Sequence, residues 1–262
     1  MITSTSNAKV KRLVNLKKKR KLRDEESVFL VEGVRMFREV PRERLLEIYV
    51  TESFLKKEEK LVKKKAAEAG AAVEVFADHV FEYVSDTKTP QGILCIVRQM
   101  EYSTEKLMDG KAPLLLVLDN IQDPGNLGTI VRTAEGAGVT GIIMSRDTVD
   151  IYNPKTIRST MGSVYRMPFV YEEDLPGVLE KMNLQGIHTF AAHLEGACSY
   201  DAADYRKGSA FLIGNEGNGL RDSVARCAGQ YIKIPMCGQV ESLNAAIAAS
   251  VLMFEAARQR RS

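Results

Sequence analysis

Polar residues that could carry chemistry gather in three short segments of the chain, each placed after a predicted strand. The segment 236–244 follows a strand that ends at Pro235, because proline cannot continue a hydrogen-bonded ladder. Here Ser242 is expected to cap the Ala-rich helix that runs to Arg260, with Asn244 inside its first turn. The free N–H groups at such a helix start favour a polar ligand.

The second segment is a glycine-rich loop that follows a predicted strand at 210–214. Three glycines within the six residues 214–219 would let the backbone approach a ligand closely. The loop is not a Walker phosphate loop, because no Lys-Ser/Thr pair follows it. Glu216 argues against a phosphate and for a donor-bearing or cationic group; a flexible surface loop is the alternative interpretation.

The third segment, 120–132, follows a buried apolar strand and opens a helix. Turn chemistry at 123–125 explains the loop but not the presence of Asn126 and Arg132. Arg132 adjoins Val131 on the apolar side of the predicted helix, so we expect a substrate phosphate or a carboxylate to pair with it. Because ligands bind at the carboxyl ends of parallel strands, the three segments together indicate one site.

The glycines at 136, 138 and 141 match the dinucleotide-binding pattern in their letters only. That pattern needs a strand before it and a helix after it, whereas here a predicted helix precedes and a strand follows. We therefore interpret these glycines as a helix stop and a tight turn.

The elements around these segments alternate between strand and helix, which favours an α/β fold with a mainly parallel sheet over 113–262. Residues 1–100 are predicted to form a smaller α/β domain, and the polar stretch 101–112 a linker. Strands are predicted at 27–31, 46–51, 73–76, 92–98, 114–119, 141–145, 188–192, 210–214 and 231–235. Helices are predicted at 7–22, 34–40, 58–68, 79–84, 127–135, 154–161, 175–183, 221–228 and 242–260.

The first 23 residues carry nine cations and no acidic residue. A solvated helix usually mixes both signs, so a polyanion such as nucleic acid is the better interpretation, and a plain solvated face is the alternative. A membrane surface is disfavoured because the stretch lacks Trp and has few large apolar residues. The predicted nucleic-acid contacts are Lys9, Lys11, Arg12, Lys17, Lys18, Lys19, Arg20, Lys21, Arg23 and Arg35.

The composition narrows the class of protein. The 262 residues are 45% hydrophobic and 27% charged, as in a soluble globular chain of one large or, better, two domains. No apolar run approaches the roughly 20 residues of a membrane span, and no secretory signal is recognisable. The four cysteines, none in a C-x-x-C pair, predict free thiols in a reducing cytoplasm and no metal site: Cys95, Cys198, Cys227 and Cys237.

Taken together, the three segments resemble the SpoU/TrmH family of RNA 2′-O-ribose methyltransferases, of the knotted SPOUT class that uses S-adenosylmethionine. The resemblance covers roughly 113–262, and the segment Phe29–Arg35 more weakly resembles the substrate-binding domain often fused ahead of it. The family motifs are matched by Asn126, Gly128 and Arg132, then by Ile213–Gly217 with Gly219 and Leu220, then by Ile234–Met236, Val240 and Ser242–Asn244.

The resemblance implies a deep trefoil knot formed by 210–220 and 231–245, a homodimer, and methyl transfer to a ribose 2′-hydroxyl. The implied catalytic residues are Arg132, Asn126, Glu216, Ser242 and Asn244. The implied cofactor-binding residues are Ile213, Gly214, Asn215, Gly217, Ile234, Met236, Ser242 and Leu243.

The resemblance makes Arg132 the residue that acts on the hydroxyl, and no histidine lies in a motif to act as a base. An arginine side chain stays protonated at neutral pH and is a poor literal base, so we expect Arg132 to orient the hydroxyl or to stabilise developing negative charge. The expected substrate is 23S ribosomal RNA, with transfer RNA as the rival. A non-catalytic RNA-binding or ribosome-assembly protein is the alternative from another class.

Overall fold

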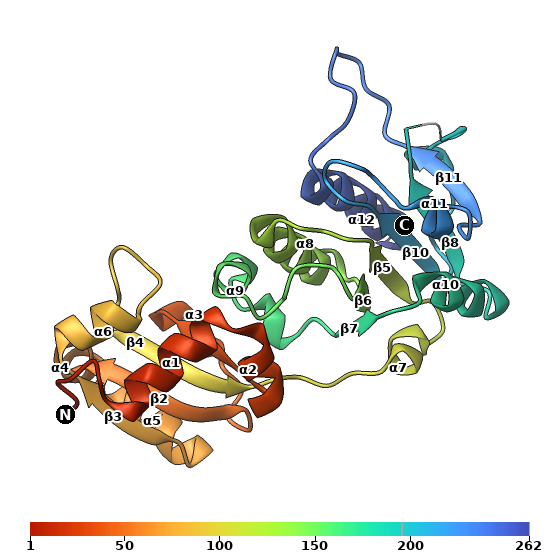
Figure 1. The fold of residues 1–262 in the computed structure, drawn as a ribbon. Coiled ribbons are helices and arrows are strands. Elements are labelled where there is room, and N and C mark those ends of the chain that lie inside the picture. Colours follow the sequence, from red (N-terminus) through yellow and green to blue (C-terminus); the bar gives the residue numbers. More distant parts are fainter. Residues whose placement is uncertain (195, 262) are drawn as a thin grey trace. The chain divides into compact units, whose positions relative to one another are not determined.

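The computed structural model describes residues 1–194 and 196–261, and the chain divides into two compact units (Figure 1). Unit 1 comprises Met1–Met100 together with Asp150–Tyr165, and unit 2 comprises Glu101–Val149 together with the chain from Arg166 onward. Each unit has a sheet of its own.

Unit 1 is built on a four-stranded mixed sheet whose central strands are β4 (Ile93–Arg98) and β2 (Leu45–Thr51). Strand β1 (Val28–Glu32) forms one edge, antiparallel to β4, and β3 (Ala72–Phe76) forms the other, parallel to β2. These four strands lie where the apolar runs of the sequence predict them, within one or two residues at each end.

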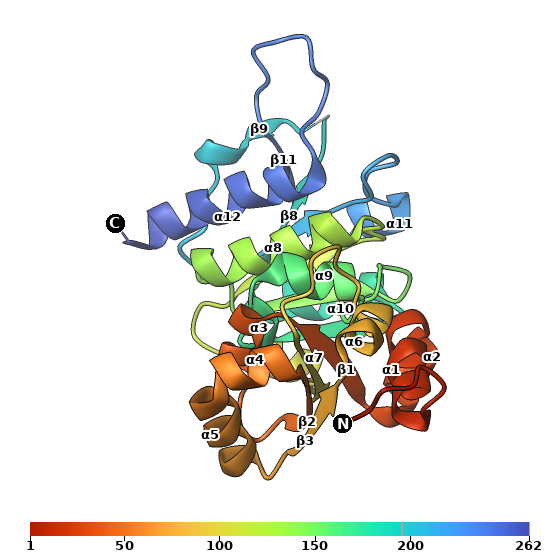
Figure 2. The same ribbon diagram turned by 90° about the vertical axis from the view of Figure 1, so that its left-hand side faces the viewer.

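Helices cover both faces of this sheet. The apolar side chains of α1 (Ala8–Lys18) and α6 (Asp78–Val84) form one core with alternate residues of the strands, including Leu30 and Ile96. Figure 2 shows α4 (Glu52–Lys57) and α5 (Glu59–Ala69) on the other side of the strands, the side on which α3 (Val34–Glu39) buries Met36 and Phe37. Two lysine-bearing surfaces, on α1 and on α4–α5, therefore belong to opposite faces.

The segment 150–165 returns to unit 1 and covers its free edge strand β1. It contains α9 (Pro154–Thr160), and Tyr152 stacks on Phe29 of β1 with 4.6 Å between the ring centroids. Asp150 forms a buried ion pair with Arg23 at the same place. The sequence assigned this segment to the second domain, since periodicity alone does not say which core an apolar helix face joins.

Unit 2 contains a seven-stranded sheet in which every neighbouring pair is parallel. The strand order is β7 (Phe169–Glu172), β6 (Gly141–Ser145), β5 (Leu114–Leu118), β10 (Ser209–Ile213), β8 (His188–Ala192), β11 (Gln230–Lys233) and β9 (Cys198–Ser199). Strands β5, β6 and β10 are buried along their whole length, as their unbroken apolar runs predict.

The helices of unit 2 form a layer on each face of the sheet. Helices α8 (Pro124–Ala137) and α12 (Ala245–Arg261) pack together on one face, and α10 (Leu175–Leu184) covers the other (Figure 1). The core under α10 also takes in α11 (Asp222–Ala225) and α7 (Thr104–Met108). The stretch 101–112 is therefore not a free linker, because α7 buries Leu107 and Met108 in this core.

Several element boundaries differ from the predicted ones for identifiable reasons. The predicted basic helix 7–22 is two helices, α1 and α2 (Arg20–Glu26), because Lys19 adopts an extended conformation between them. Helix α8 begins at Pro124, three residues earlier than predicted, because the Asp123 side chain accepts from the Asn126 N–H at 2.8 Å. Gly138 ends that helix in the left-handed region, with φ of 79°, and β6 begins at Gly141, as we interpreted these glycines.

We predict that Asp150→Ala lowers the free energy of unfolding of unit 1 by about 3–5 kcal/mol, because it leaves the Arg23 guanidinium buried without its counter-charge. Denaturant unfolding measures the loss. Lys63→Ala, which breaks the exposed Lys63–Glu59 pair of the same unit, should change the value by no more than about 1 kcal/mol. Equal effects of the two substitutions would contradict the buried pair.

Candidate active site

The carboxyl ends of β8, β10 and β11 and the start of α12 line one cavity of about 820 Å³. This is the edge of a parallel sheet where ligands bind in α/β folds. The structure brings together at this cavity all eight residues predicted to hold the cofactor: Ile213, Gly214, Asn215, Gly217, Ile234, Met236, Ser242 and Leu243.

The cavity also has a wall that sequence reasoning missed, formed by Ala192 at the end of β8 and by the next two residues, His193 and Leu194. His193 belongs to this wall, and the centroid of its ring lies 5.1 Å from that of the Tyr231 ring. The backbone N–H of His193 donates to the Ile232 carbonyl at 3.0 Å. The sequence could have indicated this wall, because a strand was predicted at 188–192. The carboxyl end of that strand must lie at the same edge of a parallel sheet as those of the other strands. No motif contains a histidine, but the cavity lining does.

The glycine-rich loop after β10 folds tightly upon itself. A Cβ added at Gly214 would lie 2.1 Å from the Gly219 carbonyl carbon and 2.1 Å from the Leu220 nitrogen. Asn215 and Gly219 exchange both backbone hydrogen bonds, at 2.9 and 3.0 Å, and Gly219 adopts φ of 69°. The chain itself approaches Gly214 closely, and this contact fixes the shape of the cavity rim that Gly214 lines.

Glu216 projects from this loop onto the start of α8. Its carboxylate accepts hydrogen bonds from the backbone N–H groups of Gln122 and Asp123, both at 3.1 Å, and from Asn126 Nδ2 at 2.9 Å. Partial burial favours the protonated acid, but these donors outweigh it and lower the pKa of Glu216. The donor-bearing group predicted for Glu216 is thus supplied by the chain's own third segment.

Asn244 completes a connection between the three segments. Its Nδ2 donates to Asn126 Oδ1 at 3.0 Å, so Glu216, Asn126 and Asn244 form a continuous hydrogen-bonded series. Its Oδ1 accepts from the N–H groups of Ala246 and Ile247, at 2.9 and 3.3 Å. Asn244 is therefore the N-cap of α12, and the prediction that Ser242 caps this helix is wrong; Ser242 is an exposed residue of the cavity lining.

Arg132 lies on α8 with its side chain exposed, rather than on the apolar side of that helix as predicted. The buried face of α8 is formed by Leu127, Ile130, Val131 and Ala134, so the polar face begins at the next position. Among residues 1–194 and 196–261, no side chain forms a hydrogen bond or an ion pair with the Arg132 guanidinium. No carboxylate of the described chain partners this group, so it is open to a group from outside.

A buried carboxylate that the sequence reasoning overlooked anchors the same loop. Asp119, at the end of β5, is fully buried and accepts from the Arg221 N–H at 2.9 Å and from Arg221 Nε at 2.7 Å. This carboxylate raises the pKa of Arg221, whose Nη1 also lies 3.3 Å from Asp147. The Arg221 end of the loop 214–221 is therefore tied to the residue that follows β5, the strand next to β10.

The amino-terminal cations of unit 1 have acidic partners, some from the residues 24–26 that directly follow the basic run and some from distant parts of the chain. The ion pairs of this group are Lys9–Glu74, Arg12–Glu26, Arg12–Glu47, Arg20–Asp24, Lys21–Glu25 and Arg23–Asp150. Arg23 is 4% exposed and so lies out of reach of a nucleic acid. Lys11, Lys18 and Lys19 are exposed, and Arg35 lies 4.0 Å from Glu39 with most of its side chain in solvent.

Two further features concern the part of the chain that the structure describes. It contains no group of three His, Cys, Asp or Glu side chains that could hold a metal ion. None of its helices is both long and apolar enough to cross a membrane.

Comparison with known proteins extends over nearly the whole chain. Residues 113–254 match the SpoU rRNA Methylase family, and residues 7–95 match the MRM3-like substrate binding domain. The chain is 32% identical over 253 residues to the 23S rRNA (guanosine(2553)-2′-O)-methyltransferase RlmP of Bacillus subtilis, covering 97% of each protein. It is similar in structure to an AdoMet-bound rRNA methyltransferase from Sinorhizobium meliloti, with a TM-score of 0.85, 30% identity, and coverage of 98% and 97% of the two chains.

We predict that Gly214→Ala abolishes S-adenosylmethionine binding, because its Cβ would collide with the backbone at Gly219 and Leu220 and displace the cavity rim. Titration calorimetry measures the binding. Gly136→Ala is the matched control: it also adds one methyl group, but at a helical position where a Cβ meets no atom within 4 Å. Wild-type affinity in Gly214→Ala would show that the rim does not shape the cofactor site.

Proposed function

Because the chain belongs to the SpoU rRNA methylase family, as its three segments predicted, we propose that it transfers a methyl group from S-adenosylmethionine to a ribose 2′-hydroxyl of 23S ribosomal RNA. The observation that carries this proposal is the cavity that gathers every predicted cofactor residue at one sheet edge. The names of the relatives support the substrate, since RlmP of Bacillus subtilis is named for a 2′-O transfer to 23S rRNA.

The cavity fits S-adenosylmethionine in size and in chemistry. Its volume of about 820 Å³ lies within the range typical of small-molecule sites. Its lining combines apolar groups such as Ile213, Ile234 and Leu243 with the polar side chains of Asn215, Glu216 and Ser242. The apolar groups would hold the adenosine portion, and the polar groups and the free backbone of the rim would hold the charged amino-acid portion.

The cofactor supplies a methyl group that a sulfonium already activates, so the protein has to position the hydroxyl and accommodate its proton. Arg132 is suited to this task as an exposed cation without a partner in the described chain. A guanidinium does not accept a proton, so Arg132 orients the ribose hydroxyl and stabilises the developing oxyanion, while the hydroxyl proton passes to solvent water. Glu216, Asn126 and Asn244 hold the start of α8, the helix that carries Arg132, against the cavity rim.

A second copy of the chain would complete the assembly. Ile247 and Phe254 are 50% and 48% exposed and lie seven residues apart on α12, hence on one face of that helix. Exposed large apolar side chains on one helix face support a homodimer through unit 2. The knotted path of 210–220 and 231–245 is likewise a proposal, supported by the family.

We predict that Arg132→Ala removes methyl transfer while leaving S-adenosylmethionine affinity close to the wild-type value. Transfer of labelled methyl groups to unmodified 23S ribosomal RNA measures the first quantity, and calorimetry the second. Arg132→Lys should recover only part of the activity, because a point charge lacks the planar fork of the guanidinium. Wild-type turnover in Arg132→Ala would refute the role given to Arg132. A wild-type protein that binds RNA but transfers no methyl group from the cofactor would refute the proposed methyltransferase activity.

We predict that replacing Lys11, Lys18, Lys19 and Lys21 together by Gln weakens RNA binding and flattens its salt dependence. The log–log salt slope should fall by about 0.7–0.9 for each phosphate contact that is lost. Filter binding between low and high salt measures the slope. Four substitutions on the opposite face of the unit 1 sheet, at Lys56, Lys57, Lys60 and Lys63, are the control; equal slopes in the two variants would mean that the basic run is only a solvated face.

A further inference from the structure

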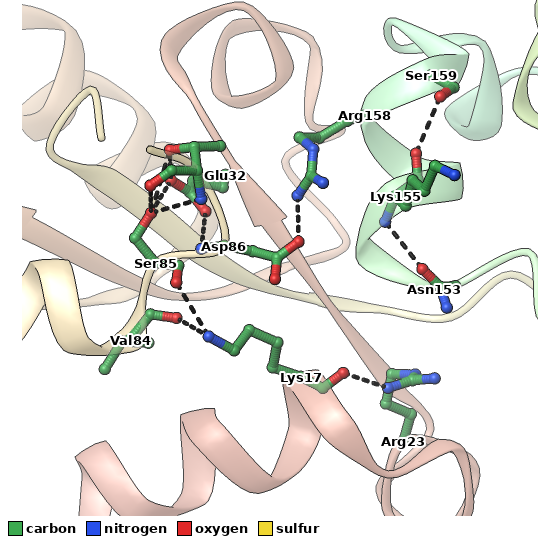
Figure 3. A network of polar contacts seen from close by, with 11 residues as sticks. Lys17, Arg23, Glu32, Val84, Ser85, Asp86, Asn153, Lys155, Arg158 and Ser159 are labelled. Atoms are coloured by element: carbon green, nitrogen blue, oxygen red, sulfur yellow. Dashed lines mark hydrogen bonds and ion pairs between the residues drawn. The ribbon is translucent and has the colours of Figure 1, made fainter. Parts of the chain in front are cut away.

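The segment Phe29–Arg35 has no part in the cofactor cavity, which lies wholly in unit 2, and Glu32 within it has an unusual set of partners. Its carboxylate accepts hydrogen bonds from Ser85 Oγ at 2.5 Å, from the Asp86 N–H at 3.0 Å and from Thr87 Oγ1 at 2.7 Å (Figure 3). All three donors lie at the start of the loop between α6 and β4. Glu32 therefore fixes the amino-terminal end of this loop.

The same segment also fixes the carboxyl-terminal end of the loop. The Val34 N–H donates to Gln91 Oε1 at 2.9 Å, and the Gly33 N–H donates to the Ile93 carbonyl at 3.0 Å. Gly33 itself has φ of 99°, a conformation that other residues rarely adopt. Three consecutive residues of one segment thus fix both ends of the loop 85–91 and leave its middle, with Lys88, exposed.

Two cations brace the loop from neighbouring helices. Lys17 at the end of α1 donates from Nζ to the carbonyls of Val84 and Ser85, at 2.8 and 3.0 Å. Arg158 of α9 pairs with Asp86 at 2.6 Å, and Figure 3 shows both side chains pointing toward each other. Only about 20 Å³ of space remains between these groups, so the joint is packed and is not a pocket for a small ligand.

The exposed charge around the loop is positive. Lys88 on the loop is exposed, as is Lys18 on α1, the neighbour of the Lys17 that contacts the loop. The acidic groups Glu32 and Asp86 are satisfied by the hydrogen bonds and the ion pair described above, and Glu39 lies 4.0 Å from Arg35. Because Arg35 and Glu39 offset each other, Lys88 and Lys18 are the exposed cations set against Glu82, an exposed carboxylate of α6.

We propose that the loop 85–91 is an RNA contact of unit 1. Residues 32–34 fix its two ends, and Lys88 in its middle binds a backbone phosphate. The proposal rests on the proposed function for the identity of the partner. A polar surface loop has little burial to order it, so the hydrogen bonds that fix it lower the entropic cost of binding in advance. Exposed positive charge on and beside a loop whose two ends are fixed matches a polyanion better than a protein partner.

The test compares the affinity of four proteins for unmodified 23S ribosomal RNA transcribed in vitro: wild type, Lys88→Ala, Glu32→Gln and the double variant. Glu32→Gln keeps the size of the side chain but replaces the charge that three donors share. At about 0.15 M salt we expect Lys88→Ala to raise Kd about fivefold and to reduce the log–log salt slope by about 0.8. Lys60→Ala, an exposed lysine on the opposite face of the sheet, is the control and should match the wild type.

Glu32 is a positioning residue in this proposal, so its effect should depend on Lys88. Glu32→Gln should weaken RNA binding when Lys88 is present, and the double variant should bind no more weakly than Lys88→Ala alone. Additive losses would overturn the positioning role. A Kd and salt slope in Lys88→Ala equal to those of Lys60→Ala would overturn the contact, and this readout does not depend on folding because Lys88 is an exposed loop residue.

Binding and catalysis are separable in this experiment. S-adenosylmethionine affinity should be the same in all the variants, since the loop belongs to unit 1 and the cavity to unit 2. If the wild type binds the RNA but transfers no methyl group, the proposed function fails while the loop is still tested by its Kd. If the wild type transfers methyl groups and Lys88→Ala binds RNA unchanged, the loop proposal fails alone.

Discussion

The carboxylate of Glu216 is the point at which segments about 90 residues apart in sequence become one site. It collects the free N–H groups before α8 and the amide of Asn126, and that amide in turn accepts from the cap of α12. A charged acceptor suits this place, because several donors can share it and hydrogen bonds to a charge are stronger than neutral ones. The shape of the cavity and the start of the helix that carries Arg132 both depend on this connection.

A second layer of polar contacts makes the connection rigid. Asp119 and Arg221 fix the far end of the loop, and the backbone pairing of Asn215 with Gly219 closes it. Gly214 has to be glycine in this arrangement because no side chain fits between the two passes of the loop. A cofactor would therefore meet a preformed rim, which favours binding because little of the chain has to be ordered afterwards.

Sequence reasoning reached the three segments of the site because each combines a strand, a polar loop and a helix start within a few residues. It placed nearly all the strands for the same reason, since apolar runs and turn residues are local signals. It did not reach the partners, which depend on tertiary structure. Ser242 and Asn244 are both good helix caps by residue type, and only the fold decides that Asn244 is the one used.

Charge was the least predictable property for the same physical reason. The first 23 residues lack any acidic residue, yet Glu26, Glu47, Glu74 and Asp150 reach them from later parts of the chain. Arg132 shows the opposite error, since a position next to Val131 suggested burial and one further step around the helix placed it in solvent. The long-range pairs do not follow from the spacing of residues along the chain, whereas Arg20–Asp24 and Lys21–Glu25, four residues apart on one helix, do.

Because the segment 150–165 belongs to unit 1, the two units cannot be separated by a single cut in the chain. The chain passes between the units after residues 100, 149 and 165, so they are interlaced and not joined end to end. A fragment cut at residue 113 would keep α9 but lose β1, and Tyr152 and Ile157, both buried in the whole protein, would face water. A cut at residue 113 would therefore leave part of unit 1 attached to unit 2 without the strand that covers it.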